Sequence, residues 1–114
     1  MTQYQVSFGK VGNANLVRLS GEIDLANAPT IGRAIVAHMT DAAAVLIDLT
    51  GVSFLDSAGV RLLDALVGDL DDHGTAIRLV VGESGAARTT LRLCAFRDDL
   101  LATDLDEAAD QVAR

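Results

Sequence analysis

The segment that decides the fold is Phe54-Leu55-Asp56-Ser57-Ala58-Gly59-Val60, because it joins a predicted strand to a predicted helix. Before it, the nearly continuous apolar run at residues 44–49 is typical of a strand that is buried on both faces. After it, apolar residues at helical spacing predict one buried stripe, made of Val60, Leu63, Leu66, Val67 and Leu70. The segment therefore lies at the carboxyl end of a strand, where open α/β sheets place functional groups. It puts the hydroxyl of Ser57 at or next to the first turn of a helix.

The rest of the chain alternates between strand and helix signals. Strands are predicted at residues 4–8, 16–20, 76–81 and 100–103, with a hairpin over the turn-rich residues 9–15. Helices are predicted around Pro29, after Ser84 as the cap, and after Asp104 with Glu107 at the capping-box position. Gly74 is predicted to end the helix that follows Ser57. This order predicts an α/β fold with one domain over residues 1–114. Its mixed, mostly parallel sheet has about four to five strands packed with about four helices.

Composition and charge exclude several classes of function. The 114 residues carry a net charge of −7, and this balance argues against nucleic acid and against an anionic membrane surface as partners. Cys94 is the only cysteine, so no disulfide can form within the chain, which fits a reducing compartment. The first residues lack the pattern of a signal peptide, and no apolar run reaches the roughly 18 residues of a membrane span. We therefore expect a cytoplasmic domain.

No catalytic, cofactor or metal motif accompanies the segment around Ser57. The sequence has no phosphate-binding or dinucleotide glycine motif and no G-x-S-x-G elbow. His73 would lie at the far end of the helix that Ser57 begins, roughly 24 Å away, and His38 belongs to another helix. One cysteine and two separated histidines cannot form a zinc site, and Cys94 is predicted to be a core residue. We expect no enzyme activity, no cofactor and no metal.

One alternative function is that of an enzyme or phosphoacceptor of the receiver type, in which Asp48 at a strand end would carry the phosphate. Such domains need an acidic cluster early in the chain and a lysine late in it. The only lysine is Lys10, which argues against this alternative.

Ser57 itself allows two interpretations. Serine is a preferred N-cap residue, so its hydroxyl could simply begin the helix, although Asp56 is an equally good cap. Alternatively, Ser57 is a phosphorylation site on a protein-binding surface. A phosphate there would meet the positive end of the helix and would add about −1.5 to −2 charges, which would repel a partner without unfolding the domain.

Three stretches together resemble the STAS domain family, and more narrowly the bacterial anti-sigma factor antagonists. They are Gly21-Glu22-Ile23-Asp24, the strand at residues 45–49, and the segment quoted above. The resemblance implies that the unphosphorylated protein binds an anti-sigma factor and so releases a sigma factor. It also implies that this partner is a serine kinase with a histidine-kinase-like ATPase fold, which phosphorylates Ser57 and thereby releases itself. A separate phosphatase acting on phospho-Ser57 would reset the switch. The candidate partner contacts are Asp24, Asp56, Ser57, Gly59, Val60 and Arg61.

One residue departs from the family pattern. Many members have a second serine or threonine after the target serine, whereas this chain has Ala58. Ser57 is therefore the only hydroxyl in the motif that could accept a phosphate. The alternative within the same family is a STAS-type scaffold or binding subunit of a lipid-transport or stress-sensing complex, in which Ser57 would only be a cap.

Overall fold

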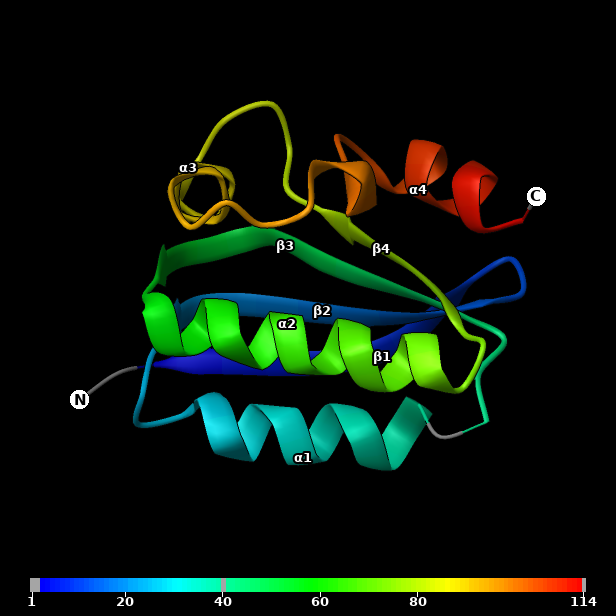
Figure 1. Cartoon of the computed structure of the whole chain (residues 1–114), viewed down its shortest axis with the longest axis horizontal. Helices are drawn as coiled ribbons and strands as arrows, with labels where there is room; N and C mark the ends of the chain where they lie inside the picture. The colour runs from blue at the N-terminus through cyan, green and yellow to red at the C-terminus, as the bar shows by residue number, and fades with distance from the viewer. Residues whose placement is uncertain (1–2, 40, 114) are drawn as a thin grey trace.

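The computed structural model describes residues 3–39 and 41–113, so residues 1, 2, 40 and 114 of the predicted domain lie outside the described residues. The strands are β1 (Tyr4–Val11), β2 (Ala14–Ile23), β3 (Ala44–Leu55), β4 (Ala76–Val80) and β5 (Leu101–Ala102). The helices are α1 (Ala28–Met39), α2 (Ser57–Asp72), α3 (Ala86–Leu93) and α4 (Leu105–Val112), with a 3-10 turn, η1 (Asp98–Leu100), before β5. The predicted order of strands and helices is confirmed (Figure 1).

The strands form one sheet in the order β1-β2-β3-β4-β5. β1 pairs with β2 antiparallel and every later pair is parallel, which confirms the predicted mixed, mostly parallel sheet. Because each parallel strand lies next to the previous one, right-handed crossovers place α1, α2 and α3 on the same face. The larger apolar core joins that face to these three helices, and a smaller core joins the opposite face to α4. α1 and α2 lie side by side along the sheet (Figure 1).

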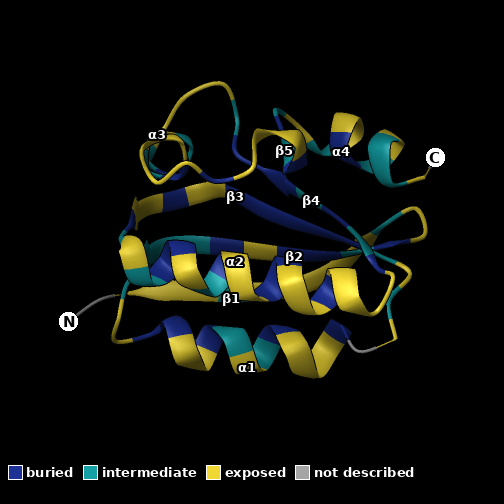
Figure 2. Ribbon diagram, in the orientation of Figure 1, coloured by how far each residue is buried: buried dark blue, intermediate teal, exposed yellow. Residues whose placement is uncertain are grey.

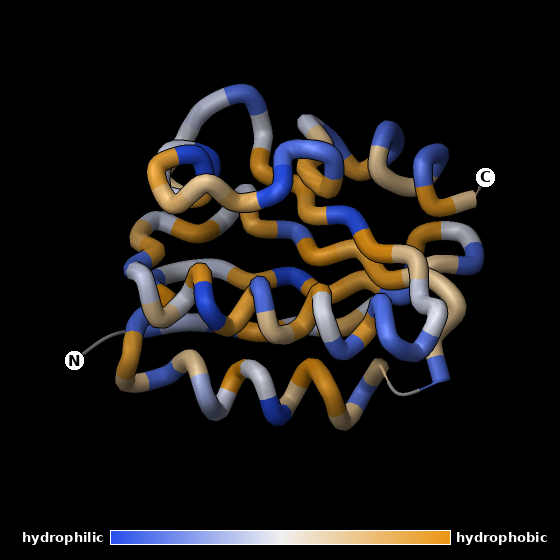
Figure 3. The backbone as a smooth tube through the Cα atoms, in the orientation of Figure 1, coloured by the Kyte–Doolittle hydropathy of each residue, from blue (hydrophilic) through white to orange (hydrophobic). Residues whose placement is uncertain are grey.

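β3 is the central strand and carries the deepest part of the core. Residues 45–47 are fully buried, as predicted for a strand covered on both faces (Figure 2). Hydrophobic segments follow the strands through the middle of the molecule (Figure 3). β3 continues to Leu55, whereas the sequence predicted an end at Leu49. In this second half, buried residues stand three apart, at Leu49, Val52 and Leu55, so the alternation that signals a strand is lost.

Two β-bulges explain that spacing of three. Arg18 pairs with Asp48 but Ser20 pairs with Gly51, and Gly21 pairs with Val52 but Glu22 pairs with Phe54. β3 therefore holds one extra residue at each shift, and each extra residue adds a second outward position between two buried ones. As a result β2 and β3 end side by side.

The ends of α2 follow the sequence signals closely. Asp56 is the N-cap, and its side chain accepts a hydrogen bond from the backbone N–H of Gly59. At the other end, Gly74 adopts a φ of +72°, and its N–H donates to the carbonyl of Asp71. The N–H of Thr75 donates to the carbonyl of Leu70, which completes a Schellman motif with Gly74 as the predicted C′ residue.

The other caps give one confirmation and one correction. Asp104 caps α4 by accepting from the N–H of Glu107 at 2.8 Å, as predicted. The prediction that Ser84 caps α3 is wrong, because the N-cap is Gly85 and no side chain bonds there. The first hairpin is also tighter than predicted, since β1 and β2 leave only Gly12 and Asn13 between them.

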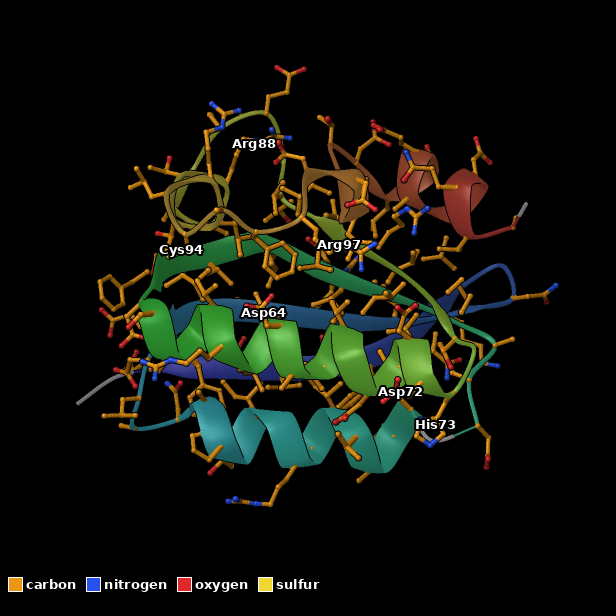
Figure 4. The ribbon with its side chains drawn as sticks, in the orientation of Figure 1. Asp64, Asp72, His73, Arg88, Cys94 and Arg97 are labelled. Carbon is orange, nitrogen blue, oxygen red and sulfur yellow. The ribbon has the colours of Figure 1, made fainter. Side chains whose placement is uncertain are left out.

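Cys94 is exposed, so its prediction as a core residue is wrong. α3 ends at Leu93, and helical spacing no longer applies to Cys94. The chain then turns at Ala95, which has a φ of 56°, and Phe96 is buried in the core instead. Figure 4 shows Cys94 on the side of the molecule where α3 lies.

Candidate functional site

The candidate site is built where β2 and β3 end. Ile23 pairs with Leu55 at the ends of the two strands, and the N–H of Asp56 donates to the carbonyl of Ile23 at 3.3 Å. The Asp56 carboxylate then accepts two backbone N–H groups, from Gly59 at 3.0 Å and from Leu25 at 3.3 Å. One carboxylate thus begins α2 and also holds the loop between β2 and α1.

The loop that follows β2 is organised by its own polar side chains. The Asp24 carboxylate accepts from the N–H groups of Ala26 at 2.9 Å and of Asn27 at 3.3 Å. Asn27 is buried; its side-chain amide donates to the carbonyl of Glu22 at 2.8 Å, and its oxygen accepts from the N–H of Asp24 at 3.0 Å. Asp24 therefore shapes this loop. The sequence analysis missed Asn27, although an asparagine just before a helix is a capping signal.

Ser57 is the first residue of α2 and is exposed. Because Asp56 provides the cap, the Ser57 hydroxyl is not needed to begin the helix. Instead it lies 3.4 Å from Nη2 of Arg61, one turn further along α2. The choice between Asp56 and Ser57 as N-cap, which the sequence left open, is settled in favour of Asp56.

Gly59 and Val60 are buried, so neither lies on the surface where the sequence analysis expected a partner contact. A Cβ atom on Gly59 would come within 2.4 Å of Cδ1 of Leu55 and 3.2 Å of Cγ2 of Ile23. The glycine therefore lets the first turn of α2 pack directly against the end of the sheet. The side chain of Val60 belongs to the large core, so both residues position the surface and do not form it.

The segments that meet at the site also carry exposed apolar side chains. Leu25, which follows Asp24 directly, is 74% exposed, and Phe54, two residues before Asp56, is 48% exposed. A shallow hollow beside Ser57 is lined by Leu25, Ala28, Pro29, Ala58, Arg61 and Leu62. The sequence did not predict that Leu25 and Phe54 are exposed. The signal that could have shown it is that each is an apolar residue at a turn or a strand end that does not fit the spacing of the buried residues. Exposed apolar groups next to polar ones are typical of protein-binding surfaces.

The geometry does not bring a histidine to Ser57. His73 lies at the opposite end of α2, with Nδ1 2.7 Å from the carbonyl of Asp69 (Figure 4). His38 lies in the last turn of α1, and its ring stacks on Phe8 with 3.9 Å between centroids. A serine nucleophile needs an adjacent base, and neither histidine can act as one for Ser57.

Asp48 lies inside β3 and not at a strand end, which corrects the placement on which the receiver-like alternative depended. Its Oδ1 accepts from the N–H of Thr50 at 2.9 Å and from the Thr50 hydroxyl at 2.7 Å, and its Oδ2 lies 3.5 Å from Nε of Arg18. This carboxylate is fully engaged within the sheet.

Across residues 3–39 and 41–113, no group of three or more His, Cys, Asp or Glu side chains is arranged to hold a metal ion. Within the same ranges, none of the helices combines the length and the apolar character that crossing a membrane requires.

Comparisons with known proteins identify the family. The chain is 30% identical to an anti-sigma factor antagonist from Mycobacterium paratuberculosis, with a TM-score of 0.86 over 98% of this chain and 96% of that one. It shares its fold with the anti-sigma factor antagonist SpoIIAA in its unphosphorylated form, at 20% identity and a TM-score of 0.78 over 96% of each chain. The phosphorylated form of the Bacillus cell fate determinant SpoIIAA gives 17% identity and a TM-score of 0.65, over 98% of this chain and all of that one. No curated protein matches the chain in sequence. The STAS domain model matches residues 6–108, and the chain therefore belongs to the STAS domain family.

Proposed function

We propose that this protein is a cytoplasmic anti-sigma factor antagonist that is switched by phosphorylation of Ser57. In the unmodified state it binds an anti-sigma factor through the surface around Asp24, Asp56, Ser57 and Arg61, and the sigma factor is released. The anti-sigma factor is a serine kinase with a histidine-kinase-like ATPase fold, and it phosphorylates Ser57 in the complex. A phosphatase then restores the hydroxyl.

The observation that carries the proposal is that the Ser57 hydroxyl is exposed while Asp56 performs the capping. A serine that caps its own helix cannot be modified without loss of that cap, whereas Ser57 can. The exposed side chains of Leu25 and Phe54 provide apolar area for a protein partner beside the hydroxyl. Further support comes from the 30% identical relative, which is described as an anti-sigma factor antagonist. SpoIIAA, which shares the fold, has structures in both phosphorylation states.

The domain would be the substrate of the kinase and not a catalyst itself. Transfer breaks the bond between the γ-phosphorus of ATP and its bridging oxygen and forms a bond from that phosphorus to the Ser57 oxygen. The hydroxyl proton passes to a base of the kinase, and ADP is the second product. The phosphate adds about −1.5 to −2 charges to a surface whose apolar groups must lose water to bind, so the partner dissociates.

The test is incubation of the protein with ATP and the anti-sigma kinases of the same genome, followed by mass spectrometry and binding measurements. We expect phosphate on Ser57 alone. Ser57→Ala should bind the kinase as tightly as the wild type and take up no phosphate. Ser57→Asp should bind at least about tenfold more weakly, although a single charge imitates phosphate only in part.

Ser84 provides the matched control, because it is also exposed but lies in the loop before α3. Ser84→Asp adds the same charge and should leave binding and phosphorylation unchanged. Phosphate on another residue, or equal weakening by Ser84→Asp and Ser57→Asp, would refute the local switch. Binding without any phosphorylation would instead favour a scaffold role for the domain.

A further inference from the structure

The side chain of Arg61 reaches back over the residue that begins α2. Its Nη2 donates to the Ser57 hydroxyl and its Nε donates to the Ser57 carbonyl, both at 3.4 Å. This direction follows from helix geometry, because side chains tilt toward the N-terminus and residues four apart lie on the same face. The guanidinium is therefore already beside the oxygen that would carry the phosphate.

Among the residues that the structure describes, Arg61 has no carboxylate partner in an ion pair. The chain has 16 acidic and 9 basic residues, so most cations could find an acid. Yet the ion pairs within residues 3–39 and 41–113 are Arg18 with Asp48 and Arg97 with Asp99. Asp64, three residues further along α2, is the nearest acid in sequence and is in neither pair. The Asp56 carboxylate accepts instead from the N–H groups of Gly59 and Leu25.

The present contacts of Arg61 are weak ones. A distance of 3.4 Å is longer than the roughly 2.7–3.2 Å of a good N–H···O hydrogen bond, and a hydroxyl carries no charge to attract the guanidinium. A phosphoryl group on the same oxygen would place three acceptor oxygens two bonds beyond Oγ, within reach of the guanidinium. Charge-assisted bonds between arginine and phosphate are shorter and about twice as strong as neutral ones.

We propose that Arg61 is the internal receptor for the phosphate on Ser57. This inference rests on the proposed function only for the presence of that phosphate. When Ser57 is unmodified, Arg61 lines the hollow beside Leu25 and Leu62, and its guanidinium is available to a partner. When Ser57 is phosphorylated, the guanidinium turns to the phosphate. Modification then acts in two ways at once, because it adds negative charge and also withdraws a cation from the docking surface.

The experiment installs phosphoserine at position 57 during translation, so that neither kinase nor partner is needed. The second ionisation of the phosphate, near pH 6, is followed by phosphorus NMR in the full chain. Arg61 should lower this midpoint by about half a pH unit, a modest shift because the pair is exposed and screened by solvent. Arg61→Gln should abolish the shift, and Arg61→Lys should restore part of it. The carboxylates of Asp24, Asp56 and Asp64 are the same in every variant, so the comparison isolates Arg61.

Arg33 on α1 provides the control, since its Nη2 also lies 3.4 Å from a hydroxyl, that of Thr30. Arg33→Gln removes the same charge and should leave the phosphate midpoint where it is in the wild type. In thermal unfolding, Arg61→Gln should lower the midpoint of the phosphorylated protein by about 3 °C more than that of the unphosphorylated protein. An unchanged phosphate midpoint in Arg61→Gln, or equal shifts from the two arginine variants, would overturn the inference. Failure of kinase recognition would contradict the proposed function but would leave this result standing.

Discussion

Replacing Asp56 by alanine tests whether one carboxylate holds both the start of α2 and the loop before α1. Loss of an N-cap costs about 1 kcal/mol of folding free energy. The second bond, from the N–H of Leu25, is longer at 3.3 Å and exposed, so its loss adds about 0.5 kcal/mol. We therefore expect Asp56→Ala to lower the free energy of unfolding by about 1.5 kcal/mol. With an unfolding entropy of about 2.1 cal/mol/K per residue over 114 residues, the thermal midpoint should fall by about 6 °C.

Asp104→Ala is the matched control, because Asp104 caps α4 through the N–H of Glu107. It should cost about 1 kcal/mol, the value for a cap alone. Urea denaturation with a shared slope would resolve the difference between the two variants, and the amide signal of Leu25 should shift only in Asp56→Ala. The double role of Asp56 is refuted if the free energy of unfolding of Asp56→Ala lies within about 0.3 kcal/mol of the wild-type value, or if the amide signal of Leu25 does not shift.

Two further predictions concern packing and pH. Gly59→Ala should destabilise the protein by about 1 kcal/mol in urea denaturation, because the clash with Leu55 outweighs the better helix propensity of alanine. Gly68→Ala is the control, because nothing lies within 4 Å of the new Cβ, and it should stabilise the protein by nearly the same amount. If both variants changed the free energy of unfolding in the same direction and by the same amount, this would contradict the packing argument. A hydrogen bond from Arg97 lowers the pKa of Asp99. The ionised carboxylate therefore stabilises the folded state fully at pH values above its unfolded pKa of about 3.9. This contribution to stability is lost as the pH falls through the lower pKa of the folded state. Arg97→Gln should therefore raise the pKa of Asp99 in a carbon NMR titration, and a fixed titration midpoint would show that the pair does not form in solution.

The sequence predicted those parts of the fold that local signals define. The stripe from Val60 to Leu70 has strict helical spacing, and the cap choices and Gly74 mark the ends of α2, so this helix was predicted closely. The first half of β3 was predicted from its apolar run. The second half was not, because two bulges replace alternation with a spacing of three.

The sequence predicted where the candidate site lies but not which of its residues cap, pack or stay exposed, because these properties depend on contacts between distant segments. Asp56 and Ser57 are equally good caps by residue type, and Asp56 is distinguished by its bonds to the N–H of Gly59 and to that of Leu25, 31 residues earlier. Burial of Gly59 depends on Ile23 in the neighbouring strand. The exposure of Cys94 depends on where α3 ends, which helical spacing alone does not reveal.

The bulges in β3 give the strand more outward residues than buried ones, which a regular strand cannot have. In a regular strand each inward residue has one outward neighbour, so outward and inward positions are equal in number. Here the buried residues Leu49, Val52 and Leu55 are separated by outward pairs, Thr50 with Gly51 and Ser53 with Phe54. Over residues 50–55 the strand that leads to the serine therefore has four outward residues for two buried ones. The exposed side chains of Ser53 and Phe54 can therefore be replaced without a change in the buried residues that hold the sheet together.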